Sequence, residues 1–435
     1  MSKPRVDVVA SLLARLGAWR RLRAQLEQKR SLGRSLARRA RRRALRTYYR
    51  TQLRAPIEPD LAVFAAYWYR GYSCNPRAIY EGVRSLAPWV RGVWVVNRDH
   101  VADMPSGVEY VVAGTRDYYR AIARAKYFVN NVNFPNELVK RAGTIHVQTH
   151  HGTPLKTMGL DLRKAFVAGS RMDFEALLRR AARWDYSISS NPFSTPVWER
   201  AYPTGFETLE VGYPRNDALV NATEADVERI REELGIALDR RAVLCAPTHR
   251  EYLETYVPTL DIARLARELG PEYVIMMRMH YFYESGLELA QDAAPADVLD
   301  VSRHPSIEEL CLAADFLVTD YSSIMFDYAV LDRPIVIHAP DWGVYQKLRG
   351  TYFDLLAEPP GVVTETDDEL VAAFRSGAAW GEESRRLRAA FRSKFCSLED
   401  GRAAERVVRK VWLVEDEARA PGVETVSPVY GRVEA

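Results

Sequence analysis

From about Leu61 onward, short apolar runs alternate with segments of helical periodicity, and this alternation limits the folds open to the chain. The first series of runs lies at residues 63–68, 93–96, 108–112, 127–129 and 145–148, with helices expected at 76–86 and 116–125. The second lies at 243–246, 273–277, 298–301, 316–319 and 335–337, with helices near 262–269 and 307–314. Strands that alternate with helices are typical of parallel, doubly wound sheets. We therefore predict two α/β domains.

The length of 435 residues is too great for one ordinary domain, and the 47% hydrophobic content is that of a globular protein. We predict a basic amphipathic helical segment at 1–55, α/β domains at 56–215 and 216–415, and a disordered tail at 416–435. Ligands of open α/β sheets bind beyond the carboxyl ends of the strands, so we expect a site in a cleft between the domains.

Basic residues are concentrated in residues 1–50, which contain 16 Lys+Arg and 2 Asp+Glu. This segment carries +14, so the rest of the chain carries −10 of the net +4. An apolar stripe recurs every three or four residues, at Val6, Val9, Leu12, Leu13, Leu16, Trp19, Leu22 and Leu26. We predict that residues 1–50 bind an anionic membrane surface, because the apolar stripe can enter the lipid interface while the arginines meet the headgroups. Nucleic acid is not the predicted partner, since binding it would require the positive charge but not the apolar stripe. The alternatives are packing on the protein's own domain and an organellar presequence.

The cysteines are far apart and lack CxxC spacing, which indicates neither a disulfide framework nor a zinc site. No apolar run approaches the roughly 20 residues of a membrane-spanning helix, and arginines interrupt the N-terminal apolar residues too early for a signal peptide. We therefore expect a protein held peripherally at the cytoplasmic face of the cell membrane.

The stretch at residues 315–341 is interpreted as strand, tight turn, helix and strand. Asp320 follows the first strand, and Ser322 and Ser323 open the helix with unpaired backbone N–H groups and the positive end of its dipole. This predicts an anion site that phosphate fits best. Asp327 lies on the same side of the helix as Ser323 and could accept hydrogen bonds from ribose. The alternatives are a helix cap at Ser322 and an exposed carboxylate at Asp327.

A histidine pair, His150 and His151, follows the predicted strand at 145–148. Histidine titrates near neutrality, so either residue could act as a general base in the cleft. Gly152 would let a ligand approach the backbone, and Lys156 adds a cation. A purely structural, hydrogen-bonded histidine is the alternative.

Two further strand ends carry a histidine and an arginine: Thr248, His249 and Arg250 follow one strand, and Arg278 and His280 follow the next. Together these cations could surround a diphosphate and neutralise a departing nucleotide without a metal. The acidic residues that could still serve as metal ligands are Asp185, Asp320 and Asp327.

At these residues the chain resembles the CDP-glycerol glycerophosphotransferase family of bacterial teichoic-acid primases and polymerases. The matching blocks are YWYRGYSCNPRAIYE (67–81), HVQTHHGTPLKTMGLD (146–161), SNPF (190–193), GYPRND (212–217), APTHRE (246–251), RMHY (278–281), TDYSSIMFDYAVLDRPIV (319–336) and RGTYFD (349–354). They keep the family's order, and the HGTPLK and TDYSS blocks together are specific.

The resemblance implies two facing Rossmann-like domains, the GT-B architecture, with an acceptor domain at 56–215 and a CDP-alditol-binding domain at 216–415. It also implies transfer of glycerol phosphate from CDP-glycerol or a related CDP-alditol, with CMP leaving and without metal or cofactor. The acceptor would be a hydroxyl of a lipid-linked saccharide, a polyol phosphate or a growing teichoic-acid-like polymer of the cell envelope.

In the family's pattern the base histidine falls on His151 and the nucleotide-side histidine on His280. His150 stands where the family commonly has tryptophan, so the choice of base between His150 and His151 stays open. The predicted substrate-binding residues are Gly152, Thr153, Lys156, Thr248, Arg250, Arg278, Asp320, Ser322, Ser323 and Asp327. The alternatives are a nucleotide-sugar glycosyltransferase of the same architecture and a non-catalytic membrane-bound scaffold. The alditol, the acceptor, primase or polymerase activity and the oligomeric state stay open.

Overall fold

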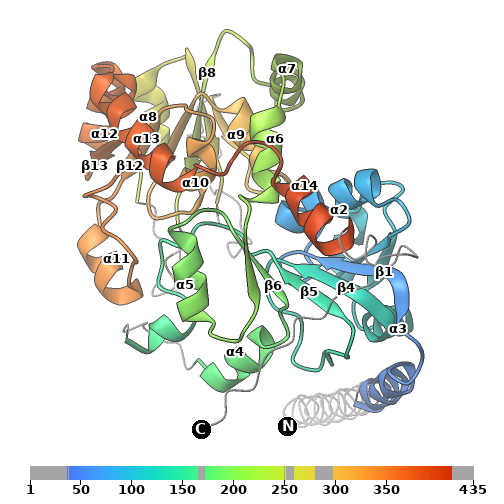
Figure 1. The fold of residues 1–435 in the computed structure, drawn as a ribbon. Coiled ribbons are helices and arrows are strands. Elements are labelled where there is room, and N and C mark those ends of the chain that lie inside the picture. The colour runs from blue at the N-terminus through green and yellow to red at the C-terminus, as the bar shows by residue number, and fades with distance from the viewer. Residues whose placement is uncertain are drawn as a thin grey trace, which may run out of the picture.

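The computed structural model describes residue 37 and residues 39–164, 172–248, 250, 259–279 and 297–413. They form two lobes, each built on one sheet (Figure 1). The first sheet has seven strands in the order β3-β2-β1-β4-β5-β6-β7, and the second has six in the order β10-β9-β8-β11-β12-β13. All neighbouring strands of both sheets are parallel. The prediction of two doubly wound α/β domains is confirmed.

The elements of the first half of the described chain are β1 (Glu58–Ala65), α2 (Cys74–Leu86), β2 (Arg91–Val96), η1 (Arg98–Asp103), β3 (Tyr110–Val112), α3 (Arg116–Arg124), β4 (Ala125–Asn130), β5 (Ile145–Gln148), η2 (Gly159–Lys164), α4 (Phe174–Ala181), β6 (Tyr186–Ser189), α5 (Ser194–Ala201), β7 (Glu207–Glu210), η3 (Pro214–Asn216), α6 (Asp217–Asn221) and α7 (Glu224–Glu233). Those of the second half are β8 (Arg241–Ala246), α8 (Ile262–Leu269), β9 (Tyr273–Met277), β10 (Val298–Asp300), α9 (Ile307–Ala313), β11 (Phe316–Thr319), α10 (Ile324–Ala329), β12 (Ile335–His338), α11 (Trp342–Arg349), β13 (Val362–Thr364), α12 (Asp367–Arg375), η4 (Ala378–Trp380), α13 (Glu382–Phe395), α14 (Ala403–Val408) and η5 (Arg409–Leu413).

Burial on both faces explains why the strands are continuous apolar runs. Along β1, Ala62 and Phe64 pack into the core on one face of the sheet, whereas Leu61, Val63 and Ala65 pack into the core on the other. The second sheet likewise separates two core clusters. Because neither face of the sheet meets water, apolar and polar residues do not alternate along these strands. The apolar runs therefore indicate where the strands lie but not which face each side chain is on.

The first strand ends earlier than the prediction of 63–68, because three residues after it adopt left-handed backbone conformations. Tyr67, Trp68 and Tyr69 have φ of +42°, +55° and +73°. The backbone N–H of Tyr67 donates to Asn131 Oδ1 at 2.9 Å, and Asn97 Nδ2 donates to the Trp68 carbonyl at 2.9 Å. These side-chain bonds replace the ladder, so the chain turns at the carboxyl end of β1.

Three strands, β6, β7 and β13, were not predicted from the sequence. Strand β6 reads YSIS and β7 reads ETLE, so both mix polar residues with few apolar ones, and β7 forms an edge of the first sheet. Strand β13 has only three residues and forms an edge of the second sheet. Edge strands bury less surface and therefore leave a weaker apolar signal.

The chain returns to the first lobe after leaving the second. Helix α14 lies beside α2 (Figure 1), and Val407, Val408, Val411 and Trp412 belong to the core of the first sheet. The predicted second domain at 216–415 included these residues. In space they complete the first domain, because the apolar side chains of α14 and η5 cover one face of its sheet.

A second connection between the lobes is an isolated antiparallel bridge between Lys156 and Thr351, and we call the segments around it, residues 155–158 and 350–352, the interdomain bridge. The backbone N–H of Thr157 donates to the Gly350 carbonyl at 3.1 Å, and the backbone N–H of Tyr352 donates to the Leu155 carbonyl at 2.8 Å. The bridge pairs the HGTPLK block with the RGTYFD block.

The described part of the basic segment is a helix at residues 39–52. It is anchored by buried Tyr49, whose hydroxyl accepts from the Val139 N–H at 2.9 Å, while the arginines at 41, 42 and 43 are exposed. The apolar stripe at residues 6–26 and the tail at 416–435 lie outside the described residues. Within the described part, the helices are all too short or too polar to span a bilayer.

Candidate functional site

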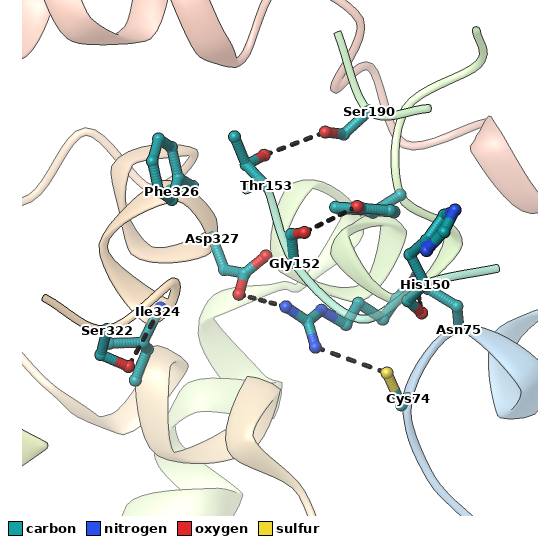
Figure 2. Close-up of polar contacts among 12 residues, drawn as sticks. Cys74, Asn75, His150, Gly152, Thr153, Ser190, Ser322, Ile324, Phe326 and Asp327 are labelled. Carbon is teal, nitrogen blue, oxygen red and sulfur yellow. Dashed lines mark hydrogen bonds and ion pairs between the residues drawn. The ribbon is translucent and has the colours of Figure 1, made fainter. Parts of the chain in front are cut away.

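The loop after β5 and the start of α10 meet between the two lobes (Figure 2). Gly152 has a φ of +156°, and a Cβ built there would lie 2.5 Å from Ser323 Oγ. A larger residue would both strain the backbone and collide with the opposite domain. The HGTPLK and TDYSS blocks, far apart in sequence, therefore lie side by side.

His150 points into the first domain, because its φ of +49° turns the chain there. Its ring stacks on Trp198 with a centroid distance of 3.9 Å and an interplanar angle of 2°, and its Nε2 lies 2.9 Å from Ser187 Oγ. Burial, with a contribution from His151, lowers the pKa of His150 to about 3. These contacts make His150 a structural residue of an aromatic cluster.

His151 retains access to solvent, and its ring centroid lies 5.6 Å from that of Tyr67. Desolvation by the surrounding protein lowers the pKa of His151 to about 4, and the positive charges of Arg215 and Lys156 add to the shift. The imidazole is therefore neutral at physiological pH, which is the state that a proton acceptor requires. Of the two adjacent histidines, His151 has the environment of a general base.

Asp327 is buried, with 5% of its surface exposed. Its Oδ2 contacts Nη2 of Arg215, which lies in η3 where the chain leaves the first domain. Burial raises the pKa of the Asp327 carboxyl to about 6, although Arg215 opposes the shift. The sequence analysis allowed an exposed carboxylate here. The structure instead gives Asp327 a buried cation as its partner, across the domain boundary (Figure 2).

Ser322 and Ser323 precede α10 as predicted. Ser323 is the N-cap residue but makes no side-chain cap bond, while Ser322 Oγ accepts a long bond of 3.5 Å from the Ile324 N–H. Both are half-buried. The hydroxyl of Ser323 therefore does not serve as a helix cap.

Thr248, Arg250 and Asp320 form a buried network beyond the carboxyl edge of the second sheet. Arg250 Nη1 donates to Asp320 Oδ2 at 2.7 Å and to the Thr248 carbonyl at 2.8 Å. Its Nε and Nη2 donate to Asp341 at 2.9 and 2.7 Å. Arg250 is 4% exposed. These bonds fix the loop after β8, and direct contact of this network with substrate stays a prediction.

The remaining predicted residues lie elsewhere in the two lobes or outside the described chain. Arg278, at the end of β9, donates to the His304 carbonyl at 2.9 Å, and burial lowers the pKa of its guanidinium. Thr153 Oγ1 lies 2.9 Å from Ser190 Oγ and is buried. Lys156 lies in the interdomain bridge, with its ammonium 5.8 Å from the Tyr345 ring centroid. The described residues do not include His249 or His280, so their predicted roles are untested.

Three charged or aromatic residues near His151 and Asp327 were missed: Tyr67, Arg215 and Glu308. Glu308 on α9 accepts from Ser306 Oγ at 3.0 Å, and its charge acts on Arg215 and Asp327. Tyr67 and Arg215 lie in blocks YWYRGY and GYPRND, which signalled the family but gave no role to single residues. Glu308 lies in no such block, so the sequence held no signal for it.

No group of three or more His, Cys, Asp or Glu within the described ranges is arranged to hold a metal ion. The acidic residues that the sequence left as possible ligands each pair with a cation: Asp185 with Lys140, Asp320 with Arg250 and Asp327 with Arg215.

Comparison with known proteins identifies the family. The family model for CDP-glycerol:poly(glycerophosphate) glycerophosphotransferase matches residues 47–413. The chain belongs to this family. The glycerophosphotransferase match begins in the basic helix and ends with η5, so it includes both lobes and the returning segment.

Two curated glycerophosphotransferase relatives illustrate the range of lengths. The chain is 36% identical to the teichoic acid poly(glycerol phosphate) polymerase of Bacillus subtilis (strain 168), over 83% of this chain and 50% of that protein. It is 35% identical to the teichoic acid glycerol-phosphate transferase of Staphylococcus aureus (strain NCTC 8325 / PS 47), over 81% of this chain and 93% of that protein. The chain thus spans about half the length of the Bacillus polymerase and nearly all of the Staphylococcus transferase.

Solved structures of the wall teichoic acid polymerase TagF share the fold. One matches with a TM-score of 0.77 and 29% identity, over 88% of this chain and 96% of that chain. A histidine-to-asparagine variant soaked with CDPG matches with a TM-score of 0.74 and 31% identity, over 84% and 90% of the two chains. The facing Rossmann-like domains expected of a GT-B glycerophosphotransferase are confirmed.

Proposed function

We propose that this chain transfers glycerol phosphate, or a related alditol phosphate, from CDP-glycerol to a hydroxyl of a lipid-linked acceptor or growing teichoic-acid-like polymer. Family membership and the likeness to the Staphylococcus aureus teichoic acid glycerol-phosphate transferase support the reaction class. The observation that carries the proposal is the close approach of the His151–Gly152 turn to Ser323, because it joins a neutral base to a serine-led helix start.

In the proposed reaction His151 removes the proton of the acceptor hydroxyl, whose oxygen attacks the β-phosphorus of CDP-glycerol. The bond from that phosphorus to the bridging oxygen breaks, and CMP leaves. Ser322 and Ser323 would hold the diphosphate with hydroxyl and N–H donors, and Arg278 and His280 would stabilise the departing CMP. Positioning and charge neutralisation supply most of the rate in phosphoryl transfer, so few covalent participants are needed.

A ribose contact of Asp327 is part of the same proposal, with a condition that the sequence did not reveal. The carboxylate already binds Arg215, so it would accept a ribose hydroxyl only through an oxygen that remains available or by exchanging this partner. The roles of Lys156, Arg250 and the remaining predicted residues stay as sequence-based predictions.

We also propose that the protein works at the cytoplasmic face of a membrane, held peripherally by residues 1–50. The exposed arginines at 41, 42 and 43 support this, because a row of guanidinium groups attracts anionic headgroups. A lipid-linked acceptor would be concentrated at the same surface.

The reaction is tested by incubating the purified protein with CDP-glycerol or CDP-ribitol and membrane lipid, then identifying the released nucleotide. We expect CMP, which marks cleavage at the β-phosphorus. Release of CDP from any CDP-linked donor would instead indicate a sugar-type transfer. Release of no nucleotide with every donor and acceptor would favour a scaffold.

The proposed base is tested with His151→Ala, and His100→Ala is the matched control. Removal of a general base is expected to lower kcat by about 100-fold or more, with the circular dichroism spectrum unchanged. The His100 side chain is 35% exposed and its Nδ1 lies 2.9 Å from Asp103 Oδ2, so its removal should leave kcat unchanged. A His151→Ala protein with wild-type turnover would remove His151 from the mechanism.

A further inference from the structure

Arg215 occupies the point where the chain leaves the first domain for the second. It lies in η3, is 5% exposed, and its guanidinium contacts Asp327 on α10 and donates to Cys74 Sγ at 3.4 Å. Cys74 begins α2, beside β1 of the first domain. A single side chain therefore touches both lobes from the segment that joins them.

The backbone of the same residue reaches the catalytic turn through one amide side chain. The Arg215 N–H donates to Asn75 Oδ1 at 3.1 Å, and Asn75 Nδ2 donates to the carbonyls of Thr149 and His150 at 3.1 Å each. Asn75 is fully buried. The peptide groups immediately before His151 are thus fixed by a residue that Arg215 orients.

The peptide group after Gly152 is held from the same crossing segment, residues 213–215. Tyr213 Oη donates to the Gly152 carbonyl at 2.9 Å, and the Arg215 guanidinium lies 5.8 Å from the Tyr213 ring centroid. A Cβ at Gly152 would lie 3.8 Å from Arg215 Nη2, so the guanidinium is also adjacent to the turn. Residues 213–215 therefore hold the turn on both sides of His151, directly through Tyr213 and through Asn75 from Arg215.

We propose that Arg215 is a positioning residue, which keeps the His151 turn of the first domain and α10 of the second in the register that transfer needs. The proposal rests on the function proposed above for His151. Its backbone bond to Asn75 holds the turn, and its guanidinium pairs with Asp327 on α10. Loss of the side chain keeps the first contact and removes the second, so the turn and α10 are no longer held by one residue.

The charge of Arg215 has a second effect, on the protonation of His151. The ionisable groups around this imidazole are Arg215, Lys156, His150 and Tyr67. Arg215 helps to lower the pKa of His151, after desolvation. Removing its charge should therefore make His151 easier to protonate, and this separates a positioning role from general loss of stability.

The test compares Arg215→Gln and Arg215→Lys with Arg231→Gln. Arg231 is equally buried, at 6% exposed, and donates to Asp315 at 3.2 Å at the amino edge of the second sheet, opposite the cleft. Arg215→Gln is expected to lower kcat by about 100-fold, the loss typical of a misplaced catalytic group, and to move the acid limb of kcat/KM to higher pH. Arg215→Lys should restore the acid limb but only part of kcat. Arg231→Gln should lower the melting temperature but change neither kcat nor the pH of the acid limb.

A second readout does not depend on activity. Amide hydrogen exchange at residues 149–153 should become faster in Arg215→Gln and in the milder Tyr213→Phe, which removes the hydroxyl that bonds the Gly152 carbonyl, and stay unchanged in Arg231→Gln. Unchanged exchange in folded Arg215→Gln, or an unchanged kcat, overturns the proposal. If His151→Ala keeps its activity, the proposed base is wrong, and the exchange data alone decide whether Arg215 holds the turn.

Discussion

Two adjacent histidines have opposite environments because of one backbone angle. The positive φ of His150 sends its ring into the stack with Trp198, whereas the next residue, His151, is exposed. Both histidines follow the same strand, and although the family's pattern placed the base on His151, residue type alone left His150 as a competing base. The choice depends on a tertiary contact, the tryptophan that fills the space behind the turn.

The pH dependence of kcat/KM follows from the lowered pKa of His151. A base must be deprotonated in the free enzyme, so kcat/KM falls as pH drops through that pKa. With the pKa lowered to about 4, kcat/KM should stay level from pH 8 to about 5. A fall centred near 6.5, the value of an unperturbed histidine, would contradict the assignment.

Stability must be followed in the same buffers. The pKa of His146, of His150 and of His151 is lowered in the folded state, mainly by burial. The unfolded chain therefore binds protons first as pH falls below about 6.5, and the free energy of unfolding decreases over this range. Circular dichroism separates that loss from protonation of the base.

The left-handed turn at residues 67–69 stores strain at the edge of the site. Trp68 has φ +55° and is 49% exposed, whereas Trp89 is 44% exposed and is not among the residues with positive φ. Glycine destabilises both positions by adding conformational entropy to the unfolded chain. At residue 68 it also relieves the strain of the left-handed backbone, which offsets part of that loss. Trp68→Gly should therefore be more stable than Trp89→Gly by about 1–2 kcal/mol. Urea unfolding measures the difference, and equal losses would show that the turn is unstrained.

Among the elements, the interdomain bridge explains a pairing that sequence could not. The HGTPLK and RGTYFD blocks both match the family, yet the second carried no predicted role. In the structure they exchange backbone hydrogen bonds, and Tyr352 Oη accepts from the Met158 N–H at 3.0 Å. Backbone pairing does not depend on side-chain type, so its partners leave no compositional trace.

The bridge is tested with Tyr352→Phe, with Tyr49→Phe as its matched control. Both hydroxyls accept a backbone N–H, at 3.0 and 2.9 Å. Only Tyr352 joins the two lobes, and its hydroxyl also donates to Asp161 Oδ2 at 3.0 Å. Each variant should lose about 1 kcal/mol of unfolding free energy. Only Tyr352→Phe should speed amide exchange at residues 157–158 and lower kcat/KM. Equal effects on catalysis would mean that the bridge does not set the cleft.

The predictability of the elements follows their burial. Strands β9 and β11 match the predicted ranges because they are largely apolar runs that polar residues end. The short edge strands were missed, and so was the buried contact of Arg215 with Asp327, since long-range ion pairs leave no periodicity. The site was predictable as a meeting of two blocks, but not in its internal contacts.

At the scale of the whole molecule, charge is divided unequally. The first 50 residues carry +14 and the remainder −10, so the two parts should respond oppositely to an anionic bilayer. The net repulsion of the body would turn the protein with its arginine helix toward the lipid.

Binding to vesicles tests this orientation. Each arginine near an anionic surface contributes about 1 kcal/mol. Replacing Arg41, Arg42 and Arg43 by glutamine should therefore weaken binding to phosphatidylglycerol vesicles by about 100-fold, and added salt should reduce the difference. The control replaces three exposed arginines of the second half, Arg385, Arg386 and Arg402. An equal loss in the control would refute a specific role for the helix.

The return of α14 and η5 to the first lobe has a consequence for biosynthesis. Trp412 and its apolar neighbours fill the core of a sheet whose last strand ends at Glu210, whereas the second sheet is complete once β13 has emerged. At 5–20 residues per second, the ribosome adds the intervening residues in roughly 10–40 s. Throughout that interval one apolar face of the first lobe stays uncovered, so the second lobe can finish folding first. Chaperones should therefore bind nascent chains of intermediate length most strongly.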